Sequence, residues 1–291
     1  MLVHIKDIVK IAQKENYAIG AFNITNFESI LAVARAAVKA NSAAIIQVSE
    51  SAIKYMGLKP VTHIVSTVAK NVAAAVPIAL HLDHGSSFDA VFECINAGFT
   101  SVHIDASSLP LDENIELTRQ VVKVAHARRV WVQGEVGAMV GSPGDISARL
   151  KKIPLAEPEE VVKFVKATKV DTIAAAIGTA HGIHANEEIV FSLLKAIKKQ
   201  VKIPFVLHGG SGVADGKIKK AIKEGASIIN IGTDLKVAFC QTLINTCLKN
   251  KKETDPRNLL KPTIVVMEKV IMEKMKLFGS AGRYRAAKME T

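Results

Sequence analysis

Three histidines in the sequence share a setting that suits a metal ion. His84, His181 and His208 each follow a short apolar run, and each directly precedes a glycine. Three neutral imidazoles that leave a fourth position open are a common ligand set for catalytic Zn²⁺. A single histidine of this kind is more typical of an ordinary loop residue than of a metal ligand, but three in the same setting predict a zinc site. The other histidines, His103 among them, lack this setting, and His81 is expected in the core or behind a ligand.

Three carboxylates at the ends of apolar runs extend the predicted site. Asp83 adjoins a presumed ligand, so it can reach a metal-bound substrate without binding the metal, as a general acid or base does. Asp105 and Glu135 end the next two runs and are further candidates for the metal site. There they would bind a second cation, orient a histidine or hold water. A structural role, such as capping the next helix, is the alternative for each of them.

Glycine-rich segments after the last two apolar runs predict a phosphate site. Residues His208–Gly212 read His-Gly-Gly-Ser-Gly, and Ile231–Asp234 read Ile-Gly-Thr-Asp. Unhindered backbone N–H groups, the hydroxyls of Ser211 and Thr233 and a helix N-terminus together form a cradle for an anion. Such residues are also common in turns. The prediction therefore depends on the position of the two segments directly after the last two apolar runs.

The elements that must position these residues alternate between short apolar runs and amphipathic segments. The runs are apolar on both faces, as strands of a buried parallel sheet are. They cover Ala18–Phe22, Ala43–Val48, Pro77–Leu82, Ser101–Ile104, Val130–Gln133, Thr172–Ile177, Pro204–Leu207 and Ser227–Ile231. Helices are expected over Phe27–Ala40, Ser87–Ala97, Asn114–Ala127, Pro158–Ala167, Glu187–Val201 and Ala214–Glu224, with candidate N-caps at Asn26, Ser86 and Asp112.

About eight strand–helix units in roughly 240 residues predict a (β/α)8 TIM barrel, an α/β fold. We expect a single domain over residues 1–291 that includes a helical tail from about residue 259. A doubly wound open sheet is the alternative, but it needs a glycine-rich turn after the first strand, and Ala21–Thr25 is not one. In a barrel, the residues that end the strands form the active site. Those residues are Asn23, Ser49, Asp83, His84, Asp105, Glu135, His181, His208 and Asn230.

Composition excludes several classes of protein. With 49% hydrophobic residues among 291, the chain is not intrinsically disordered, and its apolar runs are too short to span a bilayer. The three cysteines form no CxxC pair, which favours free thiols and a cytoplasmic location. The net charge of +11 arises from Lys195 onward, where 20 Lys and Arg face eight Asp and Glu. No nucleic-acid recognition motif accompanies this charge, which favours anionic small molecules or a solvated lysine surface.

Five motifs occur in the order known from one enzyme family. They are His81–Gly85, Gly134–Gly137, Gly178–Gly182, Leu207–Gly212 and Phe278–Arg283. On these motifs the chain resembles the class II, metal-dependent ketose-bisphosphate aldolases over essentially its whole length. The resemblance implies a Zn²⁺-dependent, reversible cleavage of a phosphorylated ketose, such as fructose 1,6-bisphosphate, to dihydroxyacetone phosphate and an aldehyde. It also implies a homodimer or a homotetramer.

The resemblance assigns roles to individual residues. His84, His181 and His208 match the zinc ligands, and Asp83 matches the residue that moves the proton of the C4 hydroxyl. The positions that match the dihydroxyacetone phosphate site are Gly182, Gly209, Ser211, Asn230 and Thr233, and those on the substrate side are Asn23 and Ser49. A monovalent cation is implied near Gly182 and Ser211. The candidates for the distal phosphate are Lys236, Arg257 and Arg283, with a solvated basic surface as the alternative.

The sequence also departs from the family pattern. Pro143 stands where a loop glutamate normally takes part in proton transfer, and proline can neither give nor take a proton. Asp145 could substitute for that glutamate only in a rearranged loop. Gln133 replaces the first of two usual glutamates, while Gly232 and Lys236 are closer to the tagatose-bisphosphate branch. The alternatives are therefore a tagatose-type enzyme, or a weakened paralogue that binds a phosphosugar without efficient turnover.

Overall fold

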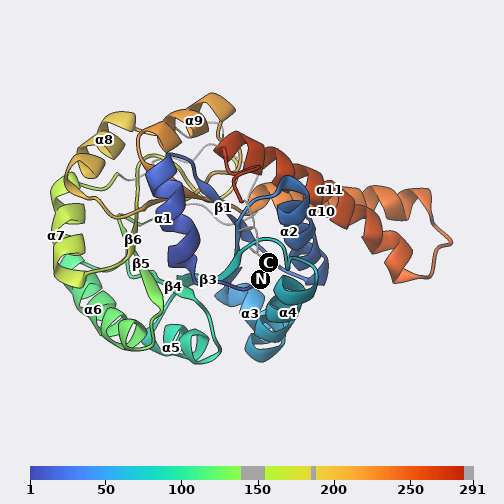
Figure 1. The fold of residues 1–291 in the computed structure, drawn as a ribbon, viewed down its shortest axis with the longest axis horizontal. Helices are drawn as coiled ribbons and strands as arrows, with labels where there is room; N and C mark the ends of the chain where they lie inside the picture. Colours follow the sequence, from blue (N-terminus) through green and yellow to red (C-terminus); the bar gives the residue numbers. More distant parts are fainter. Residues whose placement is uncertain (139–154, 185–187, 285–291) are drawn as a thin grey trace, which may run out of the picture.

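The fold is a closed barrel of parallel strands surrounded by helices (Figure 1). The structure is a computed structural model and describes residues 1–138, 155–184 and 188–284. Within these residues the strands pair in sequence order, and β1 closes on β8. They are β1 (Ile19–Asn23), β2 (Ala44–Ser49), β3 (Ile78–Gly85), β4 (Ser101–Ile104), β5 (Trp131–Val136), β6 (Thr172–Ala175), β7 (Phe205–Leu207) and β8 (Ala226–Ile231). The TIM-barrel prediction is confirmed, and the open sheet is excluded.

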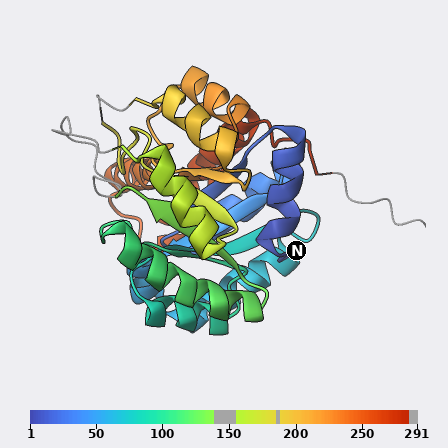
Figure 2. The same cartoon turned by 90° about the vertical axis from the view of Figure 1, so that its left-hand side faces the viewer.

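Helices cover the outside of the barrel, as Figures 1 and 2 show. The first six are α1 (Ile5–Glu15), α2 (Phe27–Ala40), α3 (Glu50–Met56), α4 (Leu58–Asn71), α5 (Phe88–Asn96) and α6 (Leu111–Ala127). The others are α7 (Pro158–Thr168), α8 (Phe191–Gln200), α9 (Asp215–Lys223), α10 (Thr233–Lys249) and α11 (Pro256–Phe278). Apolar side chains from both layers, such as Phe22, Phe164 and Phe205, are fully buried between strands and helices. Among the described residues, no helix is long and apolar enough to cross a membrane.

The predicted helix caps are confirmed in one case and wrong in two. Asn26 caps α2, because its side chain accepts a hydrogen bond from the Ser29 N–H at 2.9 Å. The cap of α5 is Ser87 rather than Ser86, whose hydroxyl donates instead to a Glu50 carboxylate oxygen at 3.0 Å. Asp112 lies inside the first turn of α6 and is not its cap. At α5 the Ser86 side chain is engaged with Glu50, and the Ser87 hydroxyl accepts the hydrogen bond from the Ala90 N–H.

Strand β3 carries an irregularity next to the predicted site. The step from Leu82 to Gly85 in β3 lies opposite the shorter step from Val102 to Ile104 in β4, so β3 holds one extra residue. His84 has a φ of +52°, in the left-handed region. Neighbouring residues of a regular strand point to opposite faces. The extra residue breaks this alternation and lets Asp83 and His84 line the same cavity.

Helices α10 and α11 form a hairpin that projects from the barrel, which we call the arm (Figure 1). Helix α10 begins directly after β8, and α11 returns to pack against α2. Only Thr233 and Leu235 are buried in α10, whereas Ile244 and Leu248 are 58% and 62% exposed. The arm therefore presents large apolar side chains to solvent.

Candidate active site

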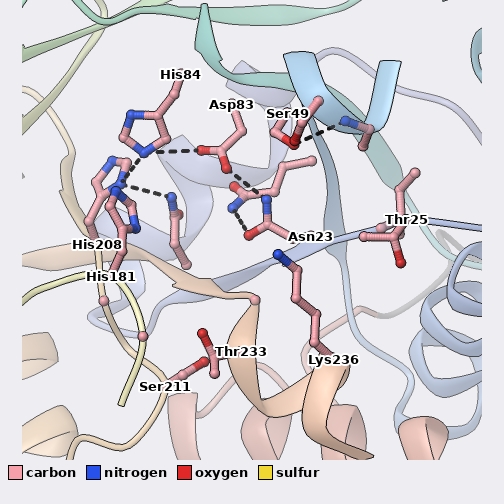
Figure 3. Close-up of a pocket in the computed structure, with 18 of the residues that line it drawn as sticks. Asn23, Thr25, Ser49, Asp83, His84, His181, His208, Ser211, Thr233 and Lys236 are labelled. Atoms are coloured by element: carbon pink, nitrogen blue, oxygen red, sulfur yellow. Dashed lines mark hydrogen bonds and ion pairs between the residues drawn. The ribbon is translucent and has the colours of Figure 1, made fainter. Parts of the chain in front are cut away.

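A cavity of about 600 Å³ opens at the carboxyl ends of the strands. Figure 3 shows its polar side chains converging from several strands. The residues predicted from the sequence that line it are Asn23, Ser49, Asp83, His84, Asp105, His181, Gly182, His208, Gly209, Ser211, Asn230, Thr233 and Lys236. Residues separated by more than 200 positions in the chain thus meet in one place, because each lies at or just beyond the end of a strand of the same barrel.

Three predicted residues lie elsewhere. Glu135 is fully buried behind the histidines rather than in the cavity wall. Arg283 lies near the amino ends of the strands, with its guanidinium 5.4 Å from the centre of the Tyr17 ring and 3.5 Å from a Glu15 carboxylate oxygen. Arg257 is at the start of α11 and bonds to Asp255. Pro143 and Asp145 lie outside the described residues, as does the 285–291 end of the predicted helical tail.

The three predicted ligand histidines face one another. His84 Nε2 lies 3.1 Å from His208 Nδ1, and the ring centroids of His84 and His181 are 4.8 Å apart. Metal–nitrogen bonds of 2.0–2.1 Å in a tetrahedron place two ligand nitrogens roughly 3.3 Å apart. The spacing of His84 and His208 is close to that value. The donor spacing of this pair therefore fits a metal ion, while His181 lies beside His84 but outside the group of ligand atoms that approach within 4.8 Å of one another.

The outer nitrogens of two of these rings are held by neighbours. His84 Nδ1 lies 2.6 Å from Asp105 Oδ2, and His208 Nε2 lies 2.9 Å from the side-chain amide of Gln133. Partners of this kind fix the orientation of a ligand histidine. Asp105 is in turn fixed by the Ser107 hydroxyl, which donates to it at 2.6 Å. Gln133 was noted in the sequence only as a departure from the family pattern.

Electrostatics favours cation binding. Burial lowers the pKa of His181 to about 4 and the pKa of His208 well below its usual value, with His84 adding to both shifts. Burial also acts against a charged His84, but Asp83 and Asp105 outweigh it and raise its pKa to about 10. His181 and His208 are thus neutral near pH 7, the form in which imidazole binds a metal. The carboxylates that attract a proton to His84 would equally attract a cation.

Asp83 is clamped by a chain of amides. Asn23 Nδ2 donates to Asp83 Oδ2 at 2.7 Å, and Gln47 Nε2 donates to Asn23 Oδ1 at 2.7 Å (Figure 3). Asp83 Oδ1 is buried without a hydrogen-bond partner among the described residues and lies 3.7 Å from His84 Nε2. One oxygen is therefore held while the other faces the histidines. Gln47 was missed in the sequence, where its signal is a lone amide inside the apolar run of β2.

His103 also belongs to the site, although the sequence did not single it out. Its ligand atoms and those of His84, Glu135 and His208 all lie within 4.8 Å of one another. His103 Nε2 is 3.5 Å from Glu135 Oε2, and both side chains are fully buried. The available signal was a histidine between the apolar residues Val102 and Ile104 of β4. Imidazole and carboxylate are ligand types that suit a divalent metal, and His84 and His208 of this His/Glu cluster are predicted ligands.

The opposite wall of the cavity is built for an anion. Helix α10 begins at Thr233, and its positive N-terminal end faces the cavity. The Ser211 hydroxyl accepts a hydrogen bond from the Asp234 N–H at 3.2 Å, which places it beside Thr233. Gly209 has a φ of +66°, and a Cβ there would lie 2.2 Å from the Ala180 carbonyl oxygen. Only glycine fits this close turn, so its backbone reaches the cavity unhindered.

Lys236 stands one turn along α10 from this wall, and its ammonium group points toward Asn23 in Figure 3. It is the only Lys or Arg among the described residues that line the cavity. Burial lowers its pKa, while Asp83 acts in the opposite direction. The cavity thus combines a cluster of histidines, a wall suited to an anion and one basic side chain near Asn23.

Comparison with known proteins agrees with this arrangement. The model of the family "Fructose-bisphosphate aldolase class-II" matches residues 3–283. This chain belongs to the class II fructose-bisphosphate aldolase family. Fructose-bisphosphate aldolase of Helicobacter pylori is 38% identical over 97% of this chain and 100% of its own length. A 6-phospho-5-dehydro-2-deoxy-D-gluconate aldolase of Bacillus subtilis is also 38% identical, over 99% of this chain and 98% of its own.

A solved structure supports the same relation. The crystal structure of the YdjI aldolase from Escherichia coli K12 has a TM-score of 0.83 and 29% identity, covering 98% of this chain and 100% of that one. The protein is thus a class II aldolase, a carbon–carbon lyase. The His/Glu cluster of this aldolase is consistent with the divalent metal of its class.

Proposed function

We propose that this aldolase reversibly cleaves a phosphorylated ketose to dihydroxyacetone phosphate and an aldehyde with the help of Zn²⁺. Fructose 1,6-bisphosphate or a close relative would be the substrate. The observation that carries the proposal is the convergence of three histidines, Asp83 and an anion wall in one cavity. A cytoplasmic location fits this activity and the free cysteines, of which Cys94 is buried and Cys240 and Cys247 are exposed.

His84, His181 and His208 would hold the metal, with Glu135 and Asp105 as supporting candidates. When bound, the ion supplies Lewis acidity at the substrate ketone. Asp83 would accept the proton of the C4 hydroxyl during cleavage and return it during condensation. The Asn23 hydrogen bond at 2.7 Å fixes the carboxylate, so its other oxygen stays directed at the substrate.

The phosphate of dihydroxyacetone phosphate would bind at the wall formed by Gly182, Gly209, Ser211 and Thr233. Backbone N–H groups and the α10 N-terminus stabilise an anion there. Asn230 would contact the ketose carbons, since its side chain lies between this wall and His208, 3.4 Å from Nδ1. A monovalent cation near Gly182 and Ser211 would balance part of the phosphate charge.

The distal end of the substrate would meet Lys236, Asn23 and Ser49. A lone lysine can pair with a phosphate or with a carboxylate, because it acts as a point charge. Fructose and tagatose bisphosphates would offer a phosphate, whereas the substrate in the name of the Bacillus subtilis relative is a gluconate. Arg283 has no part in this arrangement, given its contacts with Glu15 and Tyr17.

A lyase assay tests the proposal. Purified protein is loaded with Zn²⁺ and supplied with fructose 1,6-bisphosphate, tagatose 1,6-bisphosphate or 6-phospho-5-dehydro-2-deoxygluconate, and dihydroxyacetone phosphate is measured. We expect cleavage that is lost on chelation and restored by Zn²⁺. Cleavage that persists after chelation would contradict the metal mechanism.

A weakened paralogue is the second candidate, and Pro143 in place of the loop glutamate is the observation that favours it. A missing general acid or base costs about 10²–10⁴ in rate. This candidate predicts metal-dependent binding of dihydroxyacetone phosphate by calorimetry with turnover reduced by that factor. Turnover at an ordinary rate would eliminate it.

We also propose that the aldolase forms a homodimer or a homotetramer through the arm. Ile244, Leu248 and Val265 are 58%, 62% and 59% exposed on α10 and α11. Exposed apolar patches of this kind mark protein interfaces. Light scattering coupled to size-exclusion chromatography would give the mass, and a double I244E/L248E variant is expected to be a monomer. A wild-type monomer at micromolar concentration would refute the proposal.

A further inference from the structure

The extra residue of β3 puts His84 in a strained backbone conformation. A residue other than glycine at a φ of +52° is strained, because its Cβ approaches the following carbonyl oxygen. The other described non-glycine residues with positive φ are Asn16, Asn41, Arg129 and Lys169, and all of them follow helix ends. His84 is therefore the one case among the described residues in which this conformation occurs inside a strand. A neighbouring group must therefore stabilise this conformation of His84.

The side chain of His103 provides that support. The His84 backbone N–H donates to His103 Nδ1 at 3.3 Å instead of to a strand carbonyl. His103 is fully buried on β4, and its ring centroid lies 4.7 Å from that of His84. An amide buried without an acceptor is costly. His103 thus accepts the hydrogen bond that the irregular strand would otherwise leave unmade.

The same hydrogen bond decides the tautomer of His103. A ring nitrogen that accepts a hydrogen bond carries no proton, so the proton of the neutral ring is on Nε2. Nε2 then carries the proton and lies 3.5 Å from Glu135 Oε2. A nitrogen that bears a proton cannot bind a metal, and Nδ1 is already engaged. His103 is therefore distinct from the metal ligands that it adjoins.

We propose that His103 is a positioning residue that holds the irregular segment of β3, so that Asp83 and His84 face the cavity together. The inference rests on the proposed function for the roles of Asp83 and His84. The contact itself is a property of this fold and does not depend on which ketose is cleaved.

Three substitutions at residue 103 separate the contributions of the two ring nitrogens. In H103N the Asn side chain places an oxygen near the position of Nδ1, so the acceptor for the His84 N–H is kept. In H103Q the longer side chain reaches the position of Nε2 and leaves Nδ1 unreplaced. H103L has a similar bulk and neither polar group. H81L is the matched control, because His81 is a buried barrel histidine that bonds to the Ser101 hydroxyl at 2.9 Å and not to the irregular segment.

The readouts are Zn²⁺ affinity by competition with a coloured chelator, kcat and KM, with circular dichroism and thermal melting as checks of folding. We expect H103L and H103Q to lose about 10–100-fold in Zn²⁺ affinity, as when a residue that orients a ligand is removed. Their kcat should fall about 10²-fold through misplacement of Asp83, with KM within about threefold. H103N should stay within about threefold of wild type in both quantities, and H81L should keep its Zn²⁺ affinity.

Three outcomes would overturn the proposal. The first is that H103N and H103L both fold and lose Zn²⁺ affinity and kcat to the same extent. The second is that H103Q keeps the wild-type Zn²⁺ affinity and kcat while H103N does not. The third is that H103L has the wild-type Zn²⁺ affinity and kcat. If H103L fails to fold, the comparison of H103N with H103Q decides. If the wild-type protein cleaves no phosphorylated ketose, the proposed function fails, and the order of Zn²⁺ affinities still tests the role of His103.

Discussion

Replacement of Asp83 by asparagine isolates its chemical role. The two side chains have the same size, and the amide oxygen of the D83N variant can still accept the hydrogen bond that Asn23 donates at 2.7 Å. What disappears is the ability to take up a proton, which the proposed function assigns to the oxygen that lies 3.7 Å from His84 Nε2. General acid–base catalysis contributes about 10²–10⁴ in rate. At about 1.36 kcal/mol per tenfold, D83N should raise the barrier by about 2.7–5.4 kcal/mol.

The assay couples release of dihydroxyacetone phosphate to NADH oxidation and yields kcat and KM separately. We expect kcat to fall by the factor given above. KM should change by less than about threefold, because the anion wall is untouched. D112N is a matched control, since Asp112 is 83% exposed and its ion pair among the described residues is with Lys163 at the surface, a contact worth about 0–1 kcal/mol. If D83N kept more than about a third of wild-type kcat, Asp83 would not be the proton acceptor.

Further predictions follow from the cavity, the core and the thiols. The K236M variant should raise KM for a bisphosphate by about 10–150-fold, because a charge-assisted hydrogen bond contributes about 1.5–3 kcal/mol. In the condensation direction, the kinetics with an uncharged aldehyde should be unaffected. Equal losses with a phosphorylated and an uncharged aldehyde would contradict a role of Lys236 in binding the distal phosphate. The F164A variant should lower the free energy of unfolding in urea by about 3–5 kcal/mol, because Phe164 is fully buried; a loss below about 1 kcal/mol would contradict its place in the core. A thiol reagent should spare Cys94 in the native protein, because burial protects this thiol and raises its pKa to about 12, and should label it after unfolding; labelling of Cys94 in the native protein, detected by mass spectrometry, would contradict this burial.

Much of the fold could be predicted because its signals are local. Each strand of a parallel barrel is buried on both faces, so its apolar run shows in the sequence to within one or two residues at most ends. The glycines after His84, His181 and His208 placed these residues where strands end. The predicted ligand histidines are therefore visible in the sequence as a repeated local pattern.

Residues whose roles depend on neighbouring strands could not be predicted in this way. Gln47 supports Asn23 and His103 supports His84 only because adjacent strands have a particular register, which includes one extra residue in β3. No pattern within β4 announces an irregularity in β3. The end of the chain shows the same limit: the Ala18 N–H donates to the Phe278 carbonyl at 3.1 Å, which holds Arg283 near the amino ends of the strands.

Helix α10 connects two distant parts of the molecule as a single rigid lever. Its first residue, Thr233, lies in the cavity wall, and its 17 residues extend about 25 Å into the arm at 1.5 Å per residue. A tilt of about 5° at the first turn would therefore move the far end of the helix by about 2 Å. Small adjustments at Thr233 would be magnified at the tip of the arm, and a restraint on the tip would limit how far Thr233 can rotate.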